Sequence, residues 1–432
     1  MKEKIVQSTI ILLIGGFITK LLSLGIRINM TRQISPEGMG LYMMVLPTFN
    51  LLISIGQIGL PNALSKLIAE DKRNNKKLFL SILPIASIFN LLLMIGTIII
   101  APFISENLLH NKETYLCLVS MAFVIPFTTA SSLSRSYFFG KERMIPHVTS
   151  NILENITRLG MIMIGIPHIL PYGITITIVY IILSNIISEL VSTIVLLIFL
   201  PKNIRINTSD LKPNTKYIKE SLNIGIPNTM NRIIGSIGYF LEPILLTYFL
   251  LRNGNTSHYI TTEYGILSGY VIPLVLLPSF FTLAISQAIL PSISKDYASN
   301  NQKRIKNSIQ KSLIFSGLIG IPFTLLFSIK PSECIQIIYH TTKGANYLRI
   351  ISPFFLLQYI ESPLVSTLEA MGKSKENLKI AIISTITRML SLILFSQLNI
   401  GIYCLILTFI MNHIITSILL IKKVRKILLH WH

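Results

Sequence analysis

The stretch GLPNALSKLIAEDKRNNKKL, residues 59–78, leaves an apolar segment through a proline and runs into a basic loop. ILPSISKDYASNNQKRIKNS, residues 289–308, repeats this course in the second half of the chain. A second match joins FFGKERMIPHVTSNILENITRLG (138–160) to EAMGKSKENLKIAIISTITRML (369–390). The two matches have offsets of 230 to 232 residues. One such match can arise by chance, but two in nearly the same register indicate an internal repeat.

The composition assigns the repeat to a membrane. The chain has 432 residues, 51% of them hydrophobic and only 13% charged, with a mean hydropathy of +0.64. Soluble domains carry about 25% charged residues. So few charges cannot cover a water-facing surface of this size, so lipid must cover much of it. We therefore predict an all-α polytopic membrane protein.

Twelve apolar segments are long enough to approach the roughly 20 residues of a spanning helix. They are 5–28, 41–65, 78–103, 115–138, 147–168, 172–200, 220–250, 264–291, 308–330, 346–370, 378–398 and 400–421. The apolar run near the N-terminus has no small-residue cleavage site, so we interpret it as a retained first helix.

Lysine and arginine alternate across these segments. With a cytoplasmic N-terminus, inner stretches hold 27 of the 38, including three around 135–143, and outer stretches hold 7. The other four lie within apolar segments: Lys20, Arg158, Arg232 and Arg388. The bias follows the positive-inside rule and predicts that both termini are cytoplasmic. It also explains the net charge of +20 by loops that face anionic lipid, without nucleic acid as a partner.

The repeat unit is a lobe of six helices. Because six is even, both lobes enter the membrane from the same side, as in transporters built from two parallel bundles. We predict an N-terminal lobe over 1–200, a cytoplasmic linker over 201–219, and a C-terminal lobe with a short basic tail over 220–432. This organisation is typical of alternating access.

Two cations interrupt the first apolar segment, FITKLLSLGIRINMTR (17–32). Lys20, Ser23 and Arg27 follow each other at steps of three and four residues, which places them on one helix face. A cation in the middle of a span costs about 2.5–3.5 kcal/mol, so it should face a cavity or the bundle. A face with two cations and a hydroxyl suits an anionic ligand that carries phosphate. Alternatively, Arg27 extends to the outer headgroups.

Glu154 and Arg158 are four residues apart, in the order that favours an ion pair on a helix. Either the pair only lowers the cost of burial, or Arg158 is released to the substrate during transport. Its repeat counterpart Arg388 has Ser384 at the position of the glutamate, so we predict that Arg388 is the freer cation.

Other polar residues lie in the apolar segments. Arg232 follows Asn228 and Thr229 in the segment that opens the second lobe, where it could line a cavity. Glu189 belongs to a polar stripe that predicts contacts between helices. The predicted substrate-binding residues are Lys20, Ser23, Arg27, Arg158, Arg232 and Arg388. The predicted ion-pair or coupling residues are Glu154 and Glu189.

The motifs of enzymes are not found in the sequence. It has no Walker-type loop, HExxH motif or pair of catalytic carboxylates. Cys117, Cys334 and Cys404 lack the spacing of a metal site or a disulfide framework. We therefore expect neither catalysis, nor a metal, nor a cofactor.

Four stretches carry a family resemblance. They are EGMGLY (37–42), GLPNALSKLIAE (59–70), LPSFFTLAISQAILPSISK (277–295) and LEAMGKSKEN (368–377). The chain resembles the SpoVB-like (stage V sporulation protein B) branch of the multidrug/oligosaccharidyl-lipid/polysaccharide (MOP) exporter superfamily over essentially its whole length.

This resemblance implies a V-shaped, MATE-like bundle of two lobes in a bacterial cell membrane. It implies translocation of undecaprenyl-pyrophosphate-linked saccharides, including the peptidoglycan precursor lipid II, and a link to cell-wall synthesis proteins and to sporulation. The lipid II flippases of the superfamily place cations of the first helix in the central cavity, which corresponds here to Lys20 and Arg27.

Three functions remain open from the sequence. A flippase for lipid-linked saccharides would use the cations of the first helix. A cation-coupled multidrug exporter would need a buried carboxylate near the start of the first lobe, where only Glu37 in an outer loop is present, although Glu154 or Glu189 could substitute. A membrane-embedded enzyme or assembly factor would not need the repeat.

Overall fold

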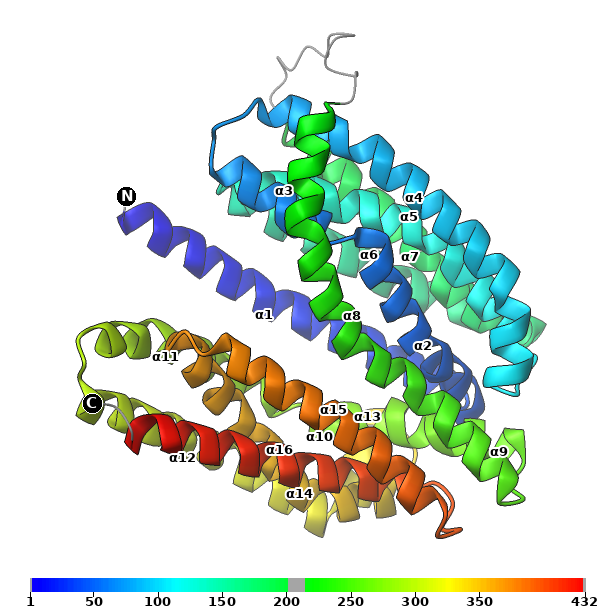
Figure 1. Cartoon of the computed structure of the whole chain (residues 1–432). Helices are drawn as coiled ribbons and strands as arrows, with labels where there is room; N and C mark the ends of the chain where they lie inside the picture. Colours follow the sequence, from blue (N-terminus) through cyan, green and yellow to red (C-terminus); the bar gives the residue numbers. More distant parts are fainter. Residues whose placement is uncertain (1, 201–213, 430–432) are drawn as a thin grey trace. The chain divides into compact units, whose positions relative to one another are not determined.

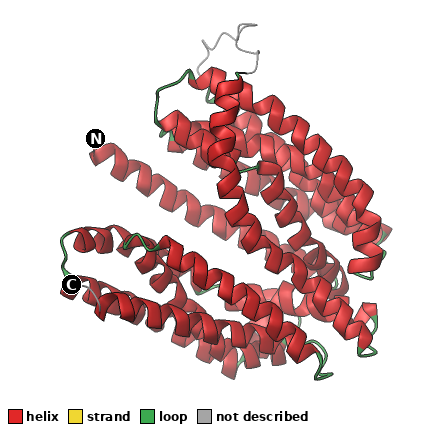
Figure 2. Ribbon diagram, in the orientation of Figure 1, coloured by secondary structure: helices red, strands yellow, loops and turns green. Residues whose placement is uncertain are grey.

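The computed structural model describes residues 2–200 and 214–429, which form helices and connecting loops without any strand (Figure 1, Figure 2). The all-α prediction is confirmed. Residues 201–213, most of the predicted linker, and the last three residues of the predicted tail lie outside the described part of the chain.

The chain divides into two compact units between Phe240 and Leu241, here called unit 1 and unit 2. The division falls inside helix α8 (Thr215–Arg252), so about the first two thirds of α8 belong to unit 1. Contacts explain this placement: Arg73 Nε donates to Glu220 Oε2 at 2.7 Å, and the backbone N–H of Asn214 donates to the hydroxyl of Ser81. The predicted boundaries of the lobes, at 200 and 220, stay a prediction.

Unit 1 is built around helix α5. The helices α2, α3, α4, α6 and α7 all pack against α5, while α1 packs mainly on α6. The bounds are α1 Lys2–Gln33, α2 Pro36–Gln57, α3 Leu60–Ala69, α4 Asn75–Phe103, α5 Thr114–Gly140, α6 Met144–Ile169 and α7 Ile174–Ile198.

Unit 2 is built around helix α14 in the same manner. The helices α11, α12, α13, α15 and α16 pack against α14. The bounds are α9 Ser257–Gly265, α10 Ile272–Val275, α11 Ser279–Ala298, α12 Gln302–Ile329, α13 Pro331–Tyr339, α14 Ala345–Ala370, α15 Ser374–Ser396 and α16 Tyr403–Leu429.

The helix order follows the repeat of the sequence. Helices α4, α5, α6 and α7 begin at residues 75, 114, 144 and 174, and α12, α14, α15 and α16 begin at 302, 345, 374 and 403. The offsets lie between 227 and 231 residues, close to those of the sequence matches. The central helices α5 and α14 are therefore counterparts.

Two predicted spans are broken in the structure. The segment 41–65 divides into α2 and α3 because Ile58 and Gly59 both adopt the left-handed backbone conformation, with φ of 47° and 60°. The segment 264–291 falls on α9 to α11, where the chain bends by 47° before α11. Pro278 caps the start of α11, and a proline after a helix prevents its continuation.

Nine helices among the described residues are long and apolar enough to cross a membrane, and the bent pair gives a tenth. The predicted count of twelve is not confirmed. The two other predicted spans correspond to α6 and α14, which carry buried charged side chains, Glu154 and Glu361 respectively, that lower their hydropathy.

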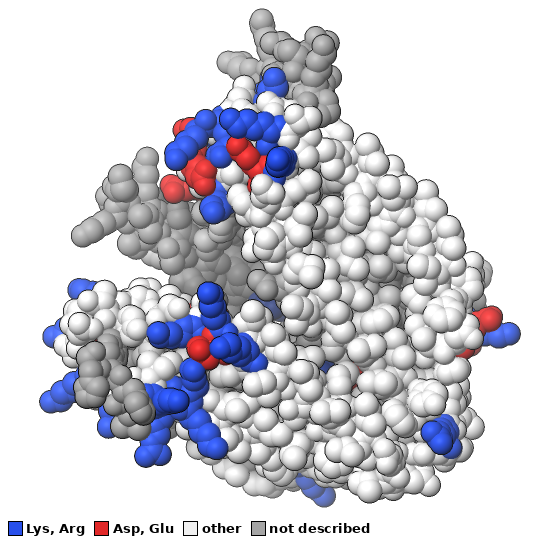
Figure 3. Space-filling model, viewed as in Figure 1, with Lys and Arg blue, Asp and Glu red and all other residues white. Residues whose placement is uncertain are grey.

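Charged residues of unit 1 gather at one end. Figure 3 shows lysines, arginines and carboxylates together where α3 ends and α4 begins, beside an uncharged flank. Residues in this cluster include Lys66, Glu70, Asp71, Lys72 and Arg73. The pKa of Glu70 is held below its usual range by a hydrogen bond from Arg73, which is 2.8 Å away. This loop is the polar end of a unit whose flank is apolar.

Candidate functional site

Helix α1 is little covered within unit 1. Only 11% of the residues in its most apolar stretch are buried. It contacts α6 closely at Gly15, where an added Cβ would lie 2.2 Å from Val148 Cγ1. A second contact is the Ser23 hydroxyl, which donates to Asn155 Oδ1 at 3.2 Å. One face of α1 therefore packs on α6, and most of the remaining surface of α1 is exposed.

The predicted stripe of α1 lies beside this contact. Lys20 and Ser23 are exposed, Arg27 is half-buried, and Thr31 is 3% exposed. The stripe therefore passes from an exposed cation to a buried hydroxyl along the helix. The Thr31 hydroxyl donates to the backbone carbonyl of Arg27 at 2.8 Å.

A chain of hydrogen bonds joins the α1 stripe to the interior of unit 1. Asn155 accepts from Ser23 and donates through Nδ2 to the carbonyl of Asn151 at 2.8 Å. Asn151 Oδ1 in turn accepts from Arg135 Nη1 at 2.6 Å. The polar face of α6 thereby connects the exposed stripe with a buried group of charges.

That group, here called the unit 1 network, consists of Arg135, Glu154, Arg158 and Glu189. Arg135 of α5 reaches Glu154 Oε2 at 2.5 Å and Glu189 Oε2 at 2.9 Å. The three side chains are 15%, 8% and 6% exposed. Arg135 therefore joins α6 to α7 by a pair of charge-assisted hydrogen bonds.

The predicted pair of Glu154 and Arg158 is confirmed, with Nη2 and Oε1 3.1 Å apart. Arg158 also donates to the Ser188 hydroxyl at 3.4 Å. Its Nε is buried and has no hydrogen-bond partner among the described residues. Two arginines and two glutamates make the network neutral, as buried charges in a membrane require.

The positive-inside count places Arg135 with the inner cations around 135–143, but Arg135 lies within a helix. It precedes the end of α5 by five residues and points into unit 1, whereas Lys141 and Arg143 beyond the helix end are exposed. The predicted span 115–138 already includes Arg135, so only its ion pairs with Glu154 and Glu189 were missed from the sequence.

Arg232 also belongs to unit 1 by its contacts. It is exposed, and its Nη1 donates to Gln57 Oε1 at 2.7 Å, at the end of α2. Gln57 donates through Nε2 to the Ser132 hydroxyl of α5 at 3.4 Å. Arg232 was expected in the second lobe because the predicted lobe begins at residue 220, whereas unit 1 extends to Phe240.

Arg388 is not the freer cation that the sequence predicted. Ser384 does leave its own helix without a carboxylate, but Arg388 forms an ion pair with Glu242 of α8. It also lies over the Phe409 ring, 5.1 Å from the centroid. Its side chain is 11% exposed, against 23% for Arg158. The partner was missed because it lies 146 residues away in the chain.

Unit 2 holds a second buried polar group that the sequence did not reveal. Glu361 Oε1 of α14 lies 3.3 Å from His413 Nδ1 and accepts from the Ser417 hydroxyl at 3.0 Å. The His413 ring also contacts Phe355, with centroids 4.7 Å apart. A single histidine in an apolar segment gave no signal, because its carboxylate belongs to another helix.

A cavity of 460 Å³ lies between α11 and α14 in unit 2. Its lining combines leucines with hydroxyl and amide groups, among them Ser286, Gln287 and Ser366. Such groups can hydrogen-bond to a polar ligand that carries hydroxyl groups.

Groups of metal ligands and paired cysteines are absent from the described part of the chain. No group of three His, Cys, Asp or Glu side chains is placed there to hold a metal ion. Cys117, Cys334 and Cys404 are free and buried.

Comparison with known proteins identifies the family of the chain. Residues 5–297 match the family model described as polysaccharide biosynthesis protein, and residues 267–394 match the MatE model. The chain is 29% identical to stage V sporulation protein B of Bacillus subtilis, over 99% of this chain and 85% of that protein. It is 21% identical to the lipid II flippase MurJ of Bacillus subtilis, over 87% and 74% of the two chains.

Solved structures share the fold. An inward closed conformation of the lipid II flippase MurJ has a TM-score of 0.72 and 18% identity, over 95% of this chain and 87% of that one. An inward-facing MATE transporter of the MOP superfamily has a TM-score of 0.71 and 16% identity, over 95% and 94%. With these relatives and its apolar helices, the chain is a multi-pass membrane protein with a MOP-superfamily fold. The family model covers more than half of its length, so the chain belongs to the polysaccharide biosynthesis protein family.

Proposed function

We propose that this protein is a flippase that moves an undecaprenyl-pyrophosphate-linked saccharide, such as lipid II, across the bacterial cell membrane by alternating access. The observation that carries the proposal is the balance of charge in unit 1. The unit 1 network is neutral within itself. The other charges well inside the described spans of unit 1 are Lys20, Arg27 and Arg232, and all three are cations.

Excess positive charge in a span suits an anionic head group. A pyrophosphate cannot enter hydrocarbon unaided, and ammonium and guanidinium groups are its natural hydrogen-bond donors. Lys20 is exposed on α1, and Ser23 one turn further adds a hydroxyl. A hydrogen bond that involves a charged group contributes about 1.5–3 kcal/mol. Loss of one such cation should therefore weaken binding by about 10- to 100-fold.

The buried arginines have a second role in the proposal. Arg158 and Arg388 sit in ion pairs, so they would reach the substrate only when a pair opens during transport. The Nε of Arg158 supports this role, because it is a buried donor without an acceptor among the described residues. Glu154 and Glu189 would hold the network together or respond to a coupling ion.

The setting of the protein follows from the same proposal. We place both termini in the cytoplasm, because 27 of the 38 lysines and arginines then lie on inner stretches. Partners would be membrane lipid, the lipid-linked precursor and proteins of cell-wall synthesis. Its likeness to stage V sporulation protein B favours a role in sporulation. The protein would act as a transporter and not as an enzyme.

A cation-coupled multidrug exporter is the second candidate. It is favoured by 25% identity to the multidrug export protein MepA of Staphylococcus aureus, over 64% of this chain. The Glu361–His413 pair supplies a buried carboxylate for it in unit 2. In unit 1, however, both buried carboxylates are already matched by arginines.

Reversal of charge on α1 separates the two candidates. Lys20→Glu with Arg27→Glu should abolish outward exposure of lipid-linked precursor in cells that depend on this protein. Arg32→Glu, in the last turn of the same helix, is the matched control and should retain exposure. Normal exposure in a double variant that inserts at wild-type level contradicts the binding role of the α1 cations on which the proposal rests. If deletion raises sensitivity to toxic cations and leaves exposure intact, the exporter is the function.

A further inference from the structure

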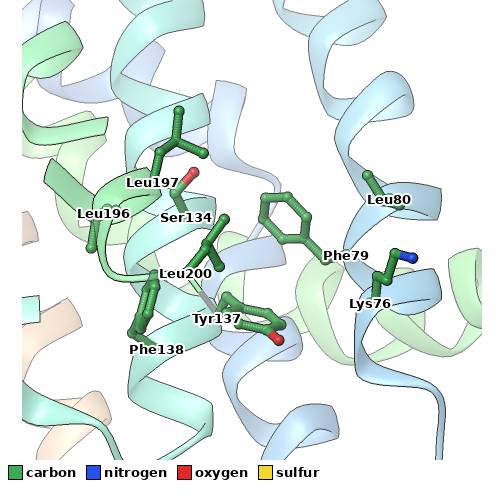
Figure 4. Close-up of a pocket in the computed structure, with 9 residues that line it drawn as sticks. All are labelled: Lys76, Phe79, Leu80, Ser134, Tyr137, Phe138, Leu196, Leu197 and Leu200. Carbon is green, nitrogen blue, oxygen red and sulfur yellow. The ribbon is translucent and has the colours of Figure 1, made fainter. Parts of the chain in front are cut away.

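A second cavity lies in unit 1, away from the α1 stripe and the buried network. It has a volume of 210 Å³, is partly open, and lies between α4, α5 and the end of α7 (Figure 4). Phe79 of α4, Phe138 of α5, and Leu196 and Leu200 at the end of α7 form its walls. The lining is almost entirely apolar, so the cavity suits hydrocarbon.

The polar groups of this cavity gather at one side. Lys76 and Tyr137 come from facing helices at the same end, as Figure 4 shows. Ser134 lies on the other side of Tyr137 along α5, and its hydroxyl donates to the carbonyl of Ala130 at 2.9 Å. An ammonium group and a phenol therefore stand at one end of a pocket with an apolar interior.

The depth of the cavity matches the boundary of a bilayer. Lys76 is in the first turn of α4, and Ser134 precedes the end of α5 by six residues. At 1.5 Å per residue the cavity extends about 9 Å from the helix ends. Lysine and tyrosine are typical of the headgroup level, and the apolar interior then lies at the level of the acyl chains.

The surface around the cavity is also apolar beside its interior and basic at its polar end. The outer side chains next to the cavity are apolar, with Leu197 58% and Ile198 75% exposed. The adjacent loop carries Lys72 and Arg73, and under the positive-inside rule it faces the leaflet that is richer in anionic lipid. Basic pockets between spanning helices on this side of a membrane bind anionic head groups.

We propose that this cavity binds an anionic phospholipid of the inner leaflet, with an acyl chain between α4, α5 and α7 and the phosphate on Lys76. Tyr137 donates a hydrogen bond at the same level. A strongly polar soluble ligand fits less well, because most of the lining side chains are apolar and would leave its polar groups without hydrogen bonds. The site is separate from the proposed transport stripe on α1, so it goes beyond the transport function.

Native mass spectrometry of the full chain in detergent tests the proposal. The probes are phosphatidylglycerol and phosphatidylcholine with identical acyl chains. Phosphatidylglycerol should bind at least about fivefold more tightly, and Lys76→Ala should remove this preference. That factor corresponds to about 1 kcal/mol for one lysine at a membrane surface. Lys77→Ala is the matched control, since Lys77 is in the same turn but outside the cavity, and should keep the preference.

A second variant tests the acyl chain. Ser134→Phe places a ring in the cavity and should weaken binding of both lipids, while the reactivity of the buried Cys117 thiol reports that unit 1 is folded. Equal effects of Lys76→Ala and Lys77→Ala, or equal binding of the two lipids by the wild type, overturn the headgroup site. Unchanged binding by Ser134→Phe overturns the acyl-chain site.

Discussion

Arg135 Nη1 of α5 lies 2.5 Å from Glu154 Oε2 of α6, and this ion pair joins the two helices inside unit 1. The second nitrogen of the same guanidinium group holds Glu189 of α7. Three consecutive helices, α5, α6 and α7, therefore share one cation. Loss of that cation leaves two buried carboxylates with only Arg158 to balance them.

We expect Arg135→Ala to lower the free energy of unfolding by about 3–5 kcal/mol, the cost of an uncompensated buried charge. Buried cysteines are unreactive, so reaction of Cys117 with a fluorescent maleimide during heating measures the unfolding of unit 1. Arg143→Ala removes an exposed arginine just past the same helix and should leave the melting temperature almost unchanged.

A double variant shows whether charge is the cause. Arg135→Met with Glu189→Leu restores neutrality and leaves the Glu154–Arg158 pair in place. It should recover most of the stability that Arg135→Met alone removes, because well-packed apolar residues can replace a buried pair. If the two losses simply add, the side chains contribute by shape and the electrostatic account fails.

Arg388→Ala should destabilise unit 2 more than Arg158→Ala destabilises unit 1. Arg388 is the more buried of the two, whereas Glu154 keeps Arg135 when Arg158 is removed. We expect about 3–5 kcal/mol for Arg388→Ala and about 1–3 kcal/mol for Arg158→Ala.

The cysteines separate these two effects. Mass spectrometry of labelled peptides should find Cys334 and Cys404 of unit 2 reacting first in Arg388→Ala, and Cys117 of unit 1 reacting first in Arg158→Ala. Early reaction of Cys117 in Arg388→Ala would contradict the assignment of the Glu242 pair to unit 2.

Gly225 on α8 meets the break between α2 and α3 at very short range. A Cβ at Gly225 would lie 2.4 Å from the carbonyl oxygen of Ile58. Gly225→Ala should therefore cost about 1–3 kcal/mol through backbone displacement. Gly235→Ala is the control on the same helix, with nothing within 4 Å of the new Cβ. It should be neutral or stabilising by up to about 1 kcal/mol from helix propensity, both variants being measured by Cys117 labelling.

The loop after α3 predicts a pH dependence. Arg73 lowers the pKa of Glu70, so this pair stabilises the fold above the ordinary glutamate pKa of about 4.3 and loses its effect as the pH falls through the lower folded value. Wild type should be more stable than Arg73→Ala at pH 7, and the difference should shrink below about pH 4. Thermal melting followed by circular dichroism at pH 7, 5 and 3.5 measures this difference. A difference that grows as the pH falls would contradict the prediction.

Local sequence signals predicted the helices and the pair within one helix. Apolar length gave the spans, and the four-residue spacing gave Glu154 and Arg158. Partners from other helices were out of reach, because no spacing rule connects Arg388 to Glu242 or Glu361 to His413. The breaks in 41–65 and 264–291 were also missed. Hydropathy continues through Ile58 and Gly59, while backbone conformation does not.

The division of the chain inside α8 has a consequence for building hybrids with relatives. The ion pairs of the unit 1 network, Glu242 with Arg388, and Glu361 with His413 each close on one side of residue 240. A junction at 240 therefore separates none of these buried pairs. A junction at the predicted linker would give Glu220 and Arg232 to one parent, and Arg73 and Gln57 to the other. Hybrids joined at residue 240, inside α8, should therefore fold, whereas hybrids joined at the predicted linker should not.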